Sequence, residues 1–417
     1  MKTQEVFTAV EKNREYLIET LRQIVAVDTS VPPGLNYGRL ADVVEPIFRS
    51  FSFRTERVIV PEEKLAQIKM PLQGERVNLV ASKELGLPPV SVYAHMDVVP
   101  VEGEWKHDPF GGEIEGAYIY GRGVSDMKGA IAALLTALKV MHDMNLKPHF
   151  DIHCMICSDE EIGVYPGAYH LALEGYFKGH FVWLEPGYQD PLEVRAAAGI
   201  IDTEIIVTGK SCHSGFNFLG VNALEESIPI LDELMALKRE VQQRESATLI
   251  YMTPTGPMKA TPMFNIDIIN SGIKSNIVPA ICRIVVNRRY LPEENYEDII
   301  RETDEAIARG RGKSKAIGVK VEHTHSYVPS VRDINSEFAE RARRAKRLVH
   351  GYEQISVVDM GGSLDMGFVI QTLHNDKVVT FGPRRTGENT AHSPDERIAV
   401  ADLVSMAKEI LLYLTLD

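Results

Sequence analysis

The chain has 417 residues, and its 58 acidic residues outnumber its 45 lysines and arginines, which gives a formal net charge of 45 − 58 = −13. At ~100–200 residues per domain, this length suggests several domains or one core with a large insertion. Hydrophobic residues make up 44% of the chain and charged residues 25%, proportions that exclude a disordered or fibrous protein. The negative balance argues against nucleic acid or an anionic membrane as the main partner, because both require clustered positive charge.

Membrane insertion and secretion are not expected either. No apolar run reaches the ~18 residues that a membrane helix needs, and residues 1–16 lack the apolar segment of a secretory signal. The four cysteines are too few for a disulfide scaffold, and Cys154 and Cys157, three positions apart in an apolar run, would point to opposite faces of a strand. We therefore expect four reduced thiols in a cytoplasmic protein.

The first part of the chain alternates helical and strand patterns. This alternation predicts a mostly parallel sheet with helices on both faces, which is an α/β fold. The predicted helices cover residues 10–27 and 127–144, and the predicted strands cover 77–81, 90–94, 151–157 and 180–184.

The pattern changes near residue 199. The next elements are a strand at 200–208, a helix at 223–245, strands at 260–269 and 280–289, a helix at 296–308 and a strand at 319–327. This βαββαβ order is that of a ferredoxin-like domain. Because α/β pattern lies on both sides of it, we interpret residues 199–327 as an insertion into a domain formed by 1–198 plus 328–417.

After the insertion, the chain returns to an alternating pattern. A helix is predicted at 334–350, a strand at 378–382 and a closing helix at 395–416. Ser393 is a plausible N-cap of the closing helix, with Pro394 at its first position and Glu396 completing a capping box.

Acidic and histidine residues follow several of the predicted strands. His95 and Asp97 follow strand 90–94, Glu160 and Glu161 follow 151–157, Glu185 follows 180–184, His392 follows 378–382, and Asp126 precedes helix 127–144. In open α/β sheets, ligands bind beyond the carboxyl ends of the strands. Each residue alone has an ordinary explanation as a structural histidine or a solvated glutamate. Together they predict a metal site, and imidazole with carboxylate suits zinc, cobalt or manganese.

Short motifs along the chain add a second line of argument. They are HMDVVP at 95–100, WKHDPF at 105–110, YGRG at 120–123, DMKG at 126–129, DEE at 159–161, GKSCHS at 209–214, SNIVP at 275–279 and GGS at 361–363. In combination they resemble the zinc aminoacylase group of metallopeptidases, which includes acetylornithine deacetylase, succinyl-diaminopimelate desuccinylase, glutamate carboxypeptidase and several dipeptidases. The resemblance runs from about Ile18 to the end of the chain. It implies a zinc-peptidase-like catalytic domain and an inserted lid and dimerisation domain.

The resemblance also implies a site for two divalent ions, most simply zinc. One ion would be held by His95, Asp126 and Glu185, and the other by Asp126, Glu161 and His392. Asp97 would hydrogen-bond His95, and Glu160 would be the general base. Three protein ligands per ion leave an open position, as catalytic zinc requires, and two ions ~3.5–4 Å apart lower the pKa of a shared water and polarise a carbonyl.

Residues of the insertion and of the later motif receive roles from the same resemblance. His213 would help to stabilise the oxyanion in the site of a neighbouring subunit, which implies a homodimer formed through the inserted domain. Asn276, Arg289, Gly362 and Ser363 would bind substrate. Asn287 stands where many family members carry Asp.

Two more histidines lie on the last strand of the insertion. His323 and His325 would face the same side of that strand, with no evident carboxylate partner, and we interpret them as structural.

The expected activity is that of a metal-dependent amidohydrolase. It would deacylate an N-acyl amino acid or a related small molecule by attack of a metal-bridging hydroxide on the amide carbonyl. An exopeptidase or dipeptidase acting on short peptides with the same site is the nearest alternative. A non-catalytic metal-binding or scaffold protein on this fold is a third.

Overall fold

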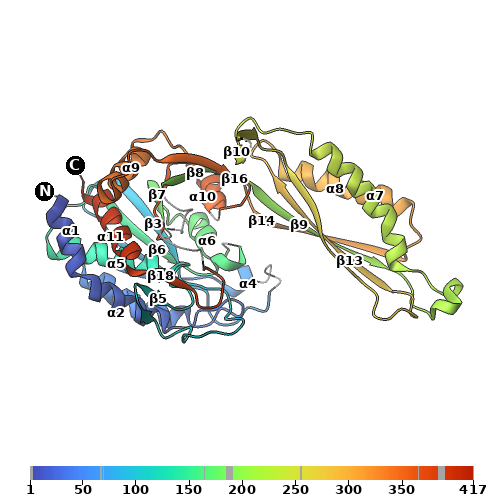
Figure 1. Ribbon diagram of the computed structural model, residues 1–417, viewed down its shortest axis with the longest axis horizontal. Helices are drawn as coiled ribbons and strands as arrows, with labels where there is room; N and C mark the ends of the chain where they lie inside the picture. The colour runs from blue at the N-terminus through green and yellow to red at the C-terminus, as the bar shows by residue number, and fades with distance from the viewer. Residues whose placement is uncertain are drawn as a thin grey trace. The chain divides into compact units, whose positions relative to one another are not determined.

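A computed structural model describes residues 3–416 except 66, 67, 69, 164, 185–190, 254, 255, 365 and 384–389. The chain divides into two compact units (Figure 1). Unit 1 comprises Met1–Arg195, Arg332–Val357 and Phe368–Asp417, and unit 2 comprises Ala196–Val331 and Val358–Gly367. The insertion predicted at 199–327 lies within unit 2. Residues 358–367, which the sequence pattern assigned to the flanking domain, group with unit 2 instead.

A six-stranded sheet forms the centre of unit 1, in the order β1-β2-β6-β3-β7-β17. Strands β6, β3, β7 and β17 are mutually parallel, whereas β1 and β2 run antiparallel at one edge. Most residues of β3, β6 and β7 are buried, which explains their continuous apolar runs. The strands are β1 Arg54–Ile59, β2 Val77–Lys83, β3 Pro89–His95, β6 Asp151–Cys157, β7 His180–Trp183 and β17 Val378–Thr380.

Helices pack against this sheet and against one another. The Ala- and Leu-rich α5 contacts α2 and α11, while α3 contacts β1 and β2 (Figure 1). Nearly every residue of α5 is buried, so its apolar sequence forms part of the core. The helices of unit 1 are α1 Thr3–Lys12, α2 Arg14–Val25, α3 Tyr37–Ser50, α4 Glu62–Leu65, α5 Lys128–Asp143, α6 Ala168–Leu173, α9 Glu337–His350 and α11 Val400–Thr415.

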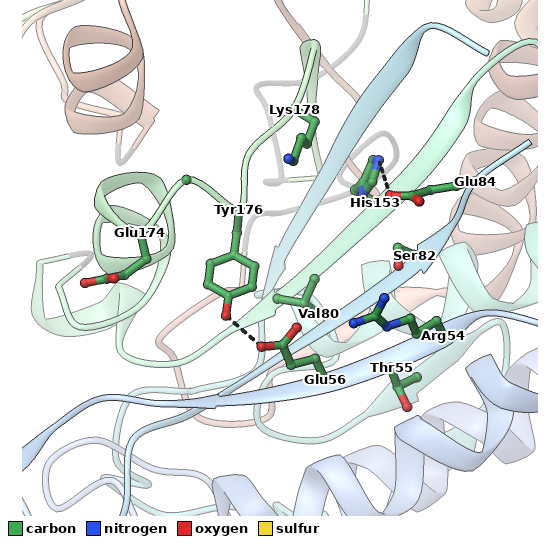
Figure 2. Close-up of a pocket in the computed structure, with 11 residues that line it drawn as sticks. Arg54, Thr55, Glu56, Val80, Ser82, Glu84, His153, Glu174, Tyr176 and Lys178 are labelled. Carbon is green, nitrogen blue, oxygen red and sulfur yellow. Dashed lines mark hydrogen bonds and ion pairs between the residues drawn. The ribbon is translucent and has the colours of Figure 1, made fainter. Parts of the chain in front are cut away.

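The antiparallel edge of the sheet has two different faces. Thr55 and Arg57 of β1 hydrogen-bond to Glu45 of α3, so these side chains lie on the helix-covered face. Arg54 and Glu56 alternate with them and lie on the opposite face, where Figure 2 shows them beside side chains of β2 and β6.

Unit 2 contains a four-stranded antiparallel sheet in the order β12-β13-β9-β14, with α7 and α8 packed together. Alternate residues of β9 and β13 are buried, which places one face of the sheet in a core. The elements, in the predicted βαββαβ order, are β9 Gly199–Thr208, α7 Ala223–Val241, β12 Met263–Ser271, β13 Ile281–Tyr290, α8 Tyr296–Gly312 and β14 Gly318–Tyr327.

Two smaller sheets were not predicted. A five-stranded sheet has the order β11-β10-β16-β8-β15, and a three-stranded sheet has the order β18-β5-β4. Helix α10 (Met366–Leu373), β8 (Leu192–Ala197) and β16 (Ser356–Met360) cross the boundaries between the units along the chain. The remaining strands are β4 Glu113–Glu115, β5 Tyr118–Tyr120, β10 Ile250–Thr253, β11 Gly256–Lys259, β15 Ser330–Val331 and β18 Arg397–Ala399.

Some predicted elements were wrong in extent. The helix predicted at 10–27 is two helices, α1 and α2. The closing helix begins at Val400, because Arg397–Ala399 pairs with β5, so Ser393 and Glu396 do not form its capping box. None of the helices in the described part of the chain has the length and apolarity that crossing a bilayer requires.

Candidate metal centre

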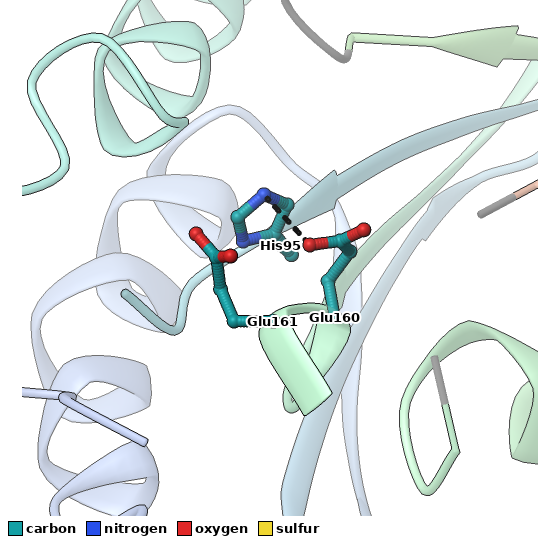
Figure 3. A group of neighbouring side chains, drawn as sticks. All are labelled: His95, Glu160 and Glu161. Atoms are coloured by element: carbon teal, nitrogen blue, oxygen red, sulfur yellow. Dashed lines mark ion pairs between the residues drawn. The ribbon is translucent and has the colours of Figure 1, made fainter. Parts of the chain in front are cut away.

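Three side chains of the site follow the ends of two neighbouring parallel strands, β3 and β6. Strand β3 ends at His95, which lies opposite Cys157 at the end of β6. After β6 the chain turns at Asp159, whose φ is 61°, and enters a short 3-10 turn, η1, formed by Glu160–Ile162. His95, Glu160 and Glu161 therefore lie at the same edge of the sheet, and Figure 3 shows their side chains gathered around a common point.

The structure brings these three side chains together with two more from distant segments. One ligand atom from each of His95, Glu160 and Glu161 lies within 4.8 Å of the others, and the same holds for Asp126, Glu161 and His392. The His392 Nε2–Glu161 Oε1 distance is 3.0 Å. Glu185, a predicted ligand, lies outside the described residues.

Asp126 lies between the two imidazoles. Its Oδ1 is 3.3 Å from Nε2 of His95, and its Oδ2 is 3.6 Å from Nε2 of His392. The two oxygens of one carboxylate thus face different histidines. This geometry suits a carboxylate shared between two cations.

Asp97 is buried behind the centre and contacts two of its members. Its Oδ2 accepts a hydrogen bond of 2.9 Å from the backbone N–H of Glu161. Nδ1 of His95 lies 3.1 Å from the Asp97 carbonyl oxygen and 3.4 Å from Oδ1. Because these contacts fix the His95 ring, Nε2 is directed at Asp126 and Glu160.

Glu396 positions the segment that carries Asp126, a role that the sequence did not reveal. Its Oε1 accepts from the backbone N–H groups of Ser125 and Asp126, at 2.9 and 3.1 Å. Its Oε2 accepts from the Gly123 N–H at 3.0 Å and from Arg122 Nη1 at 2.8 Å. Glu396 and Arg122 are each 1% exposed. The local sequence SPDE suggested a helix cap, and only the fold places this carboxylate against residues 122–126.

A second buried group supports the turn before η1. The Tyr37 hydroxyl donates to Asp159 Oδ1 at 2.8 Å, and Arg76 Nε lies 3.5 Å from Asp159 Oδ2. Burial raises the pKa of Asp159 to about 7, and the nearby Asp97 charge acts in the same direction. Sequence reasoning missed Tyr37 and Arg76 because they come from segments far from the DEE motif.

Two predicted residues of unit 2 lie close together. His213 is exposed and forms an isolated bridge with Ile277, and its Nδ1 accepts from the Gly215 N–H at 3.1 Å. The Ser214 N–H donates to the carbonyl of Asn276 at 3.0 Å. The segments that carry His213 and Asn276 are therefore neighbours.

The other predicted substrate residues form a separate group in unit 2. Arg289 Nη1 lies 3.4 Å from the Gly361 carbonyl oxygen, and its Nε donates to Asn287 Oδ1 at 3.2 Å. The Gly362 carbonyl accepts from the Ala198 N–H, and the Ser363 hydroxyl donates to the Ala198 carbonyl. Arg289 thus lies beside the GGS segment.

Asn287 and Tyr251 complete this group. Asn287, which stands where many family members carry Asp, donates to Asp202 Oδ1 at 2.7 Å and accepts from Arg289. Arg289 is therefore still connected to a carboxylate, through Asn287. A side chain added at Gly361 would come within 3.4 Å of the buried Tyr251 hydroxyl. No local sequence pattern indicated Tyr251, because β10 approaches the GGS segment only through the five-stranded sheet.

The two histidines of β14 have partners that the sequence did not reveal. His323 lies between Thr203 and the carboxylate of Asp304, at 2.9 and 3.0 Å, so the expectation that it lacks a carboxylate partner was wrong. His325 is hydrogen-bonded to the Tyr290 hydroxyl at 2.6 Å.

Comparison with known proteins identifies the family. Residues 91–415 match the profile of Peptidase family M20/M25/M40. The chain belongs to this family. Like other M20 proteins, it is a metal-dependent hydrolase of amide bonds. This membership favours an enzyme over the non-catalytic scaffold.

Two relatives match most of the chain. The N-formyl-4-amino-5-aminomethyl-2-methylpyrimidine deformylase of Halalkalibacterium halodurans is 24% identical over 99% of this chain and 96% of its own. The succinyl-diaminopimelate desuccinylase of a Bradyrhizobium species is 28% identical over 88% of this chain and 90% of its own.

Solved structures share the fold. Human carnosine dipeptidase 1 is 18% identical, with a TM-score of 0.78 over 99% of this chain and 98% of its own. A dinuclear metal-binding M20 peptidase from Bacillus subtilis is 14% identical, with a TM-score of 0.64 over 97% of this chain and 99% of its own.

The donor set fits divalent metal ions. It consists of imidazole nitrogens and carboxylate oxygens, without a thiolate, which suits zinc and its neighbours. Burial raises the pKa of Glu161; its hydrogen bond with His392 opposes this increase, and the charge of Asp126 adds to it. Bound cations would offset the mutual repulsion of these carboxylates.

Proposed function

We propose that the protein is a two-metal deacylase that hydrolyses the amide bond of an N-acyl amino acid. The observation that carries this proposal is the position of Asp126, whose two oxygens face His95 and His392 separately. In the proposal His95, Asp126 and Glu185 hold one ion, and Asp126, Glu161 and His392 hold the other. Zinc is the preferred metal, with cobalt and manganese as alternatives.

Each group then has a separate role in hydrolysis. Two bound cations supply the positive charge that lowers the pKa of water and polarises the substrate carbonyl. Glu160, whose Oε2 lies 3.9 Å from His95 Nε2, takes the proton of the attacking water. It then delivers that proton to the amide nitrogen, so that the C–N bond breaks and the products are a carboxylate and an amine. His213 of one subunit helps to stabilise the oxyanion in the site of the neighbouring subunit by hydrogen bonding.

Substrate recognition is assigned to unit 2. Arg289 carries a fixed guanidinium suited to a bidentate contact with the carboxylate of an amino acid. Its neighbours Gly362 and Ser363, together with Asn276, supply further polar contacts. Deformylase and desuccinylase relatives support an acyl substrate.

A dipeptidase is the second candidate, because the fold matches human carnosine dipeptidase 1 over 99% of the chain. The two activities share their catalytic groups, so a substrate panel separates them. N-formyl, N-acetyl and N-succinyl amino acids and a set of dipeptides are incubated with enzyme loaded with zinc, cobalt or manganese. Preference for the acylated amino acids supports deacylation, and exclusive cleavage of dipeptides contradicts it. Full activity in Glu160→Gln, or activity that survives exhaustive chelation, contradicts the mechanism.

The proposal includes a homodimer formed through unit 2. Strand β12 is an edge strand of the four-stranded sheet, and its Ile268 and Ile269 are 39% and 48% exposed. Leu224 and Ile228 of α7, one turn apart, are 39% and 51% exposed. An unpaired edge beside exposed apolar side chains is suited to pairing with a second copy. Sedimentation of the protein and of Ile228→Asp tests this: a dimer that becomes monomeric supports it, and a monomeric parent protein contradicts it.

A cytoplasmic location is the last part of the proposal. The four cysteines are free thiols, as expected in a reducing compartment.

A further inference from the structure

A cavity lies in unit 1, apart from the metal centre. It measures about 230 Å³ and lies between β1, β2, β6 and the loop that follows α6 (Figure 2). His153, near the start of β6, pairs with Ser91 of β3. Ser91 precedes His95 by four residues, which is ~13 Å along a strand at ~3.3 Å per residue. None of the residues that line the cavity belongs to the metal centre.

Strand register places the polar floor of the cavity. Arg54 pairs with Ser82, and Ser82 pairs with His153, so the three side chains form a row across neighbouring strands on one face. Glu56 follows Arg54 by two residues on β1, and Glu84 follows Ser82 by two residues, just past the end of β2. Both side chains therefore lie on the same face as this row.

The loop at 174–178 is attached to the sheet at both sides of the cavity. The backbone N–H of Lys178 donates to Ser91 Oγ at 2.7 Å, and Ser91 Oγ donates to the Lys178 carbonyl at 2.9 Å. The Tyr176 hydroxyl donates to Glu56 Oε1 at 2.8 Å. These contacts hold Lys178 at the rim of the cavity, where Figure 2 shows its amine on the opposite side from Arg54.

The charges around the cavity differ in whether they already have partners. Glu56 is bonded to Tyr176, and Glu174 forms an ion pair of 2.6 Å with Lys64. Neither Arg54 nor Lys178 has an ion pair among the described residues, and both side chains are exposed. Two cations therefore face the cavity with their charge available.

One carboxylate is available as well. Glu84 Oε1 is 3.9 Å from His153 Nε2, which exceeds hydrogen-bonding distance. Burial lowers the pKa of His153, so its ring is neutral near pH 7 and leaves the Glu84 charge uncompensated. The cavity thus offers positive charge from Arg54 and Lys178, and negative charge from Glu84.

We propose that this cavity binds a free α-amino acid, with its carboxylate between Arg54 and Lys178 and its ammonium at Glu84. Because Glu174 is paired with Lys64, the remaining lining charges are Arg54 and Lys178 against Glu56 and Glu84, which sum to 2 − 2 = 0 and suit a zwitterion better than a polyanion such as phosphate. The volume lies below the ~300–1,000 Å³ of sites for drug-sized ligands and suits a smaller molecule. The inference rests on the charges that line the cavity. It relates to the proposed function in one respect, because deacylation of an N-acyl amino acid releases a free amino acid, which is the class of ligand proposed here.

Calorimetric titration of the metal-loaded protein tests the site. The probes are glycine, L-glutamate, L-lysine and L-methionine, with acetate, methylammonium and inorganic phosphate as partial ligands. We expect at least one amino acid to bind with a Kd of ~1 mM or tighter, and acetate and phosphate to bind more weakly. Arg54→Gln and Lys178→Gln should each weaken amino-acid binding about tenfold, because each loses a charge-assisted contact.

Two further variants separate this site from the others. Glu84→Gln should weaken binding of the amino acid but not of acetate, since only the ammonium contact is lost. Arg14→Gln, an exposed arginine on α2, is the matched control and should leave the Kd unchanged. The proposal is overturned by absence of binding, by undiminished binding in the Arg54 and Lys178 variants, or by phosphate binding more tightly than amino acids. Hydrolysis is assayed separately, so failure of this site leaves the test of deacylation intact.

Discussion

The Glu396→Gln variant tests whether the buried Glu396 carboxylate stabilises the segment that carries Asp126. Each oxygen of Glu396 accepts two hydrogen bonds, one set from Ser125 and Asp126 and the other from Gly123 and Arg122. Glutamine has one accepting oxygen, so in either orientation its amide NH₂ faces two donors. Loss of two hydrogen bonds to a charged group, at about 1.5–3 kcal/mol each, predicts a decrease of about 3–6 kcal/mol in the free energy of unfolding. The loss of a charge partner for buried Arg122 gives a similar magnitude, about 3–5 kcal/mol.

Urea denaturation of the metal-free protein measures this change, and zinc titration measures its effect on the metal centre. We expect weaker zinc binding, because the backbone of Asp126 loses its support. Glu11→Gln is the matched control, since Glu11 is 53% exposed and its ion pair with Lys408 lies at the surface. Exposed pairs contribute about 0–1 kcal/mol. A decrease below about 1 kcal/mol in Glu396→Gln would refute the reasoning.

Three further predictions concern Asp97, Tyr251 and His180. Asp97→Asn should lower zinc affinity about 10–100-fold in calorimetry, because the Asp97 carboxylate supports His95 and the Glu161 backbone. Tyr251→Phe should raise KM for N-acyl amino acids about 2–10-fold with little change in kcat, if the hydroxyl binds substrate beside Arg289. Burial holds the pKa of His180 at about 3. The contribution of its neutral form to the free energy of unfolding is therefore complete above pH ~6.5 and is lost as the pH falls toward 3. This loss amounts to at most about 1.4 kcal/mol per pH unit. In His180→Phe the free energy of unfolding should therefore fall less steeply with decreasing pH, by up to that amount.

Each of these predictions has a contrary outcome. Unchanged zinc affinity in Asp97→Asn would show that His95 is positioned without it. A Tyr251→Phe enzyme with lower kcat and unchanged KM would place the hydroxyl in the chemical step instead of in binding. Equal slopes of unfolding free energy against pH for wild type and His180→Phe, between pH 6 and 4, would show that His180 titrates normally in the fold.

The sequence predicted the gathering of side chains at one sheet edge because this gathering follows from strand direction. The apolar runs of β3 and β6 indicated parallel buried strands, and the carboxyl ends of parallel strands lie at the same edge of a sheet. His95 and the Glu160–Glu161 pair come directly after those ends. Their roles at a metal ion stay predictions, as does the role of Glu185.

Other features depend on contacts that no local pattern encodes. Residues 358–367 group with unit 2 through pairings such as Tyr251 with Asp359, which are 108 positions apart. The local SPDE sequence favours a helix start at Glu396. In the structure the Glu396 carboxylate instead accepts hydrogen bonds from backbone N–H groups at 123–126, which the local sequence does not reveal. Strand β18 then occupies the residues that would have formed the first turn of α11.

The pairing of His392 with Glu161 has a consequence for synthesis of the chain. The two residues are 231 positions apart. At ~5–20 residues per second, a ribosome takes roughly 10–50 s to add His392 after Glu161 has been made. During this interval His95, Asp126 and Glu161 exist without their last partner, and α5 lacks the apolar cover of α11. A nascent chain therefore has an unfinished core and an incomplete set of proposed cation ligands at the same time, and both are completed by the final segment.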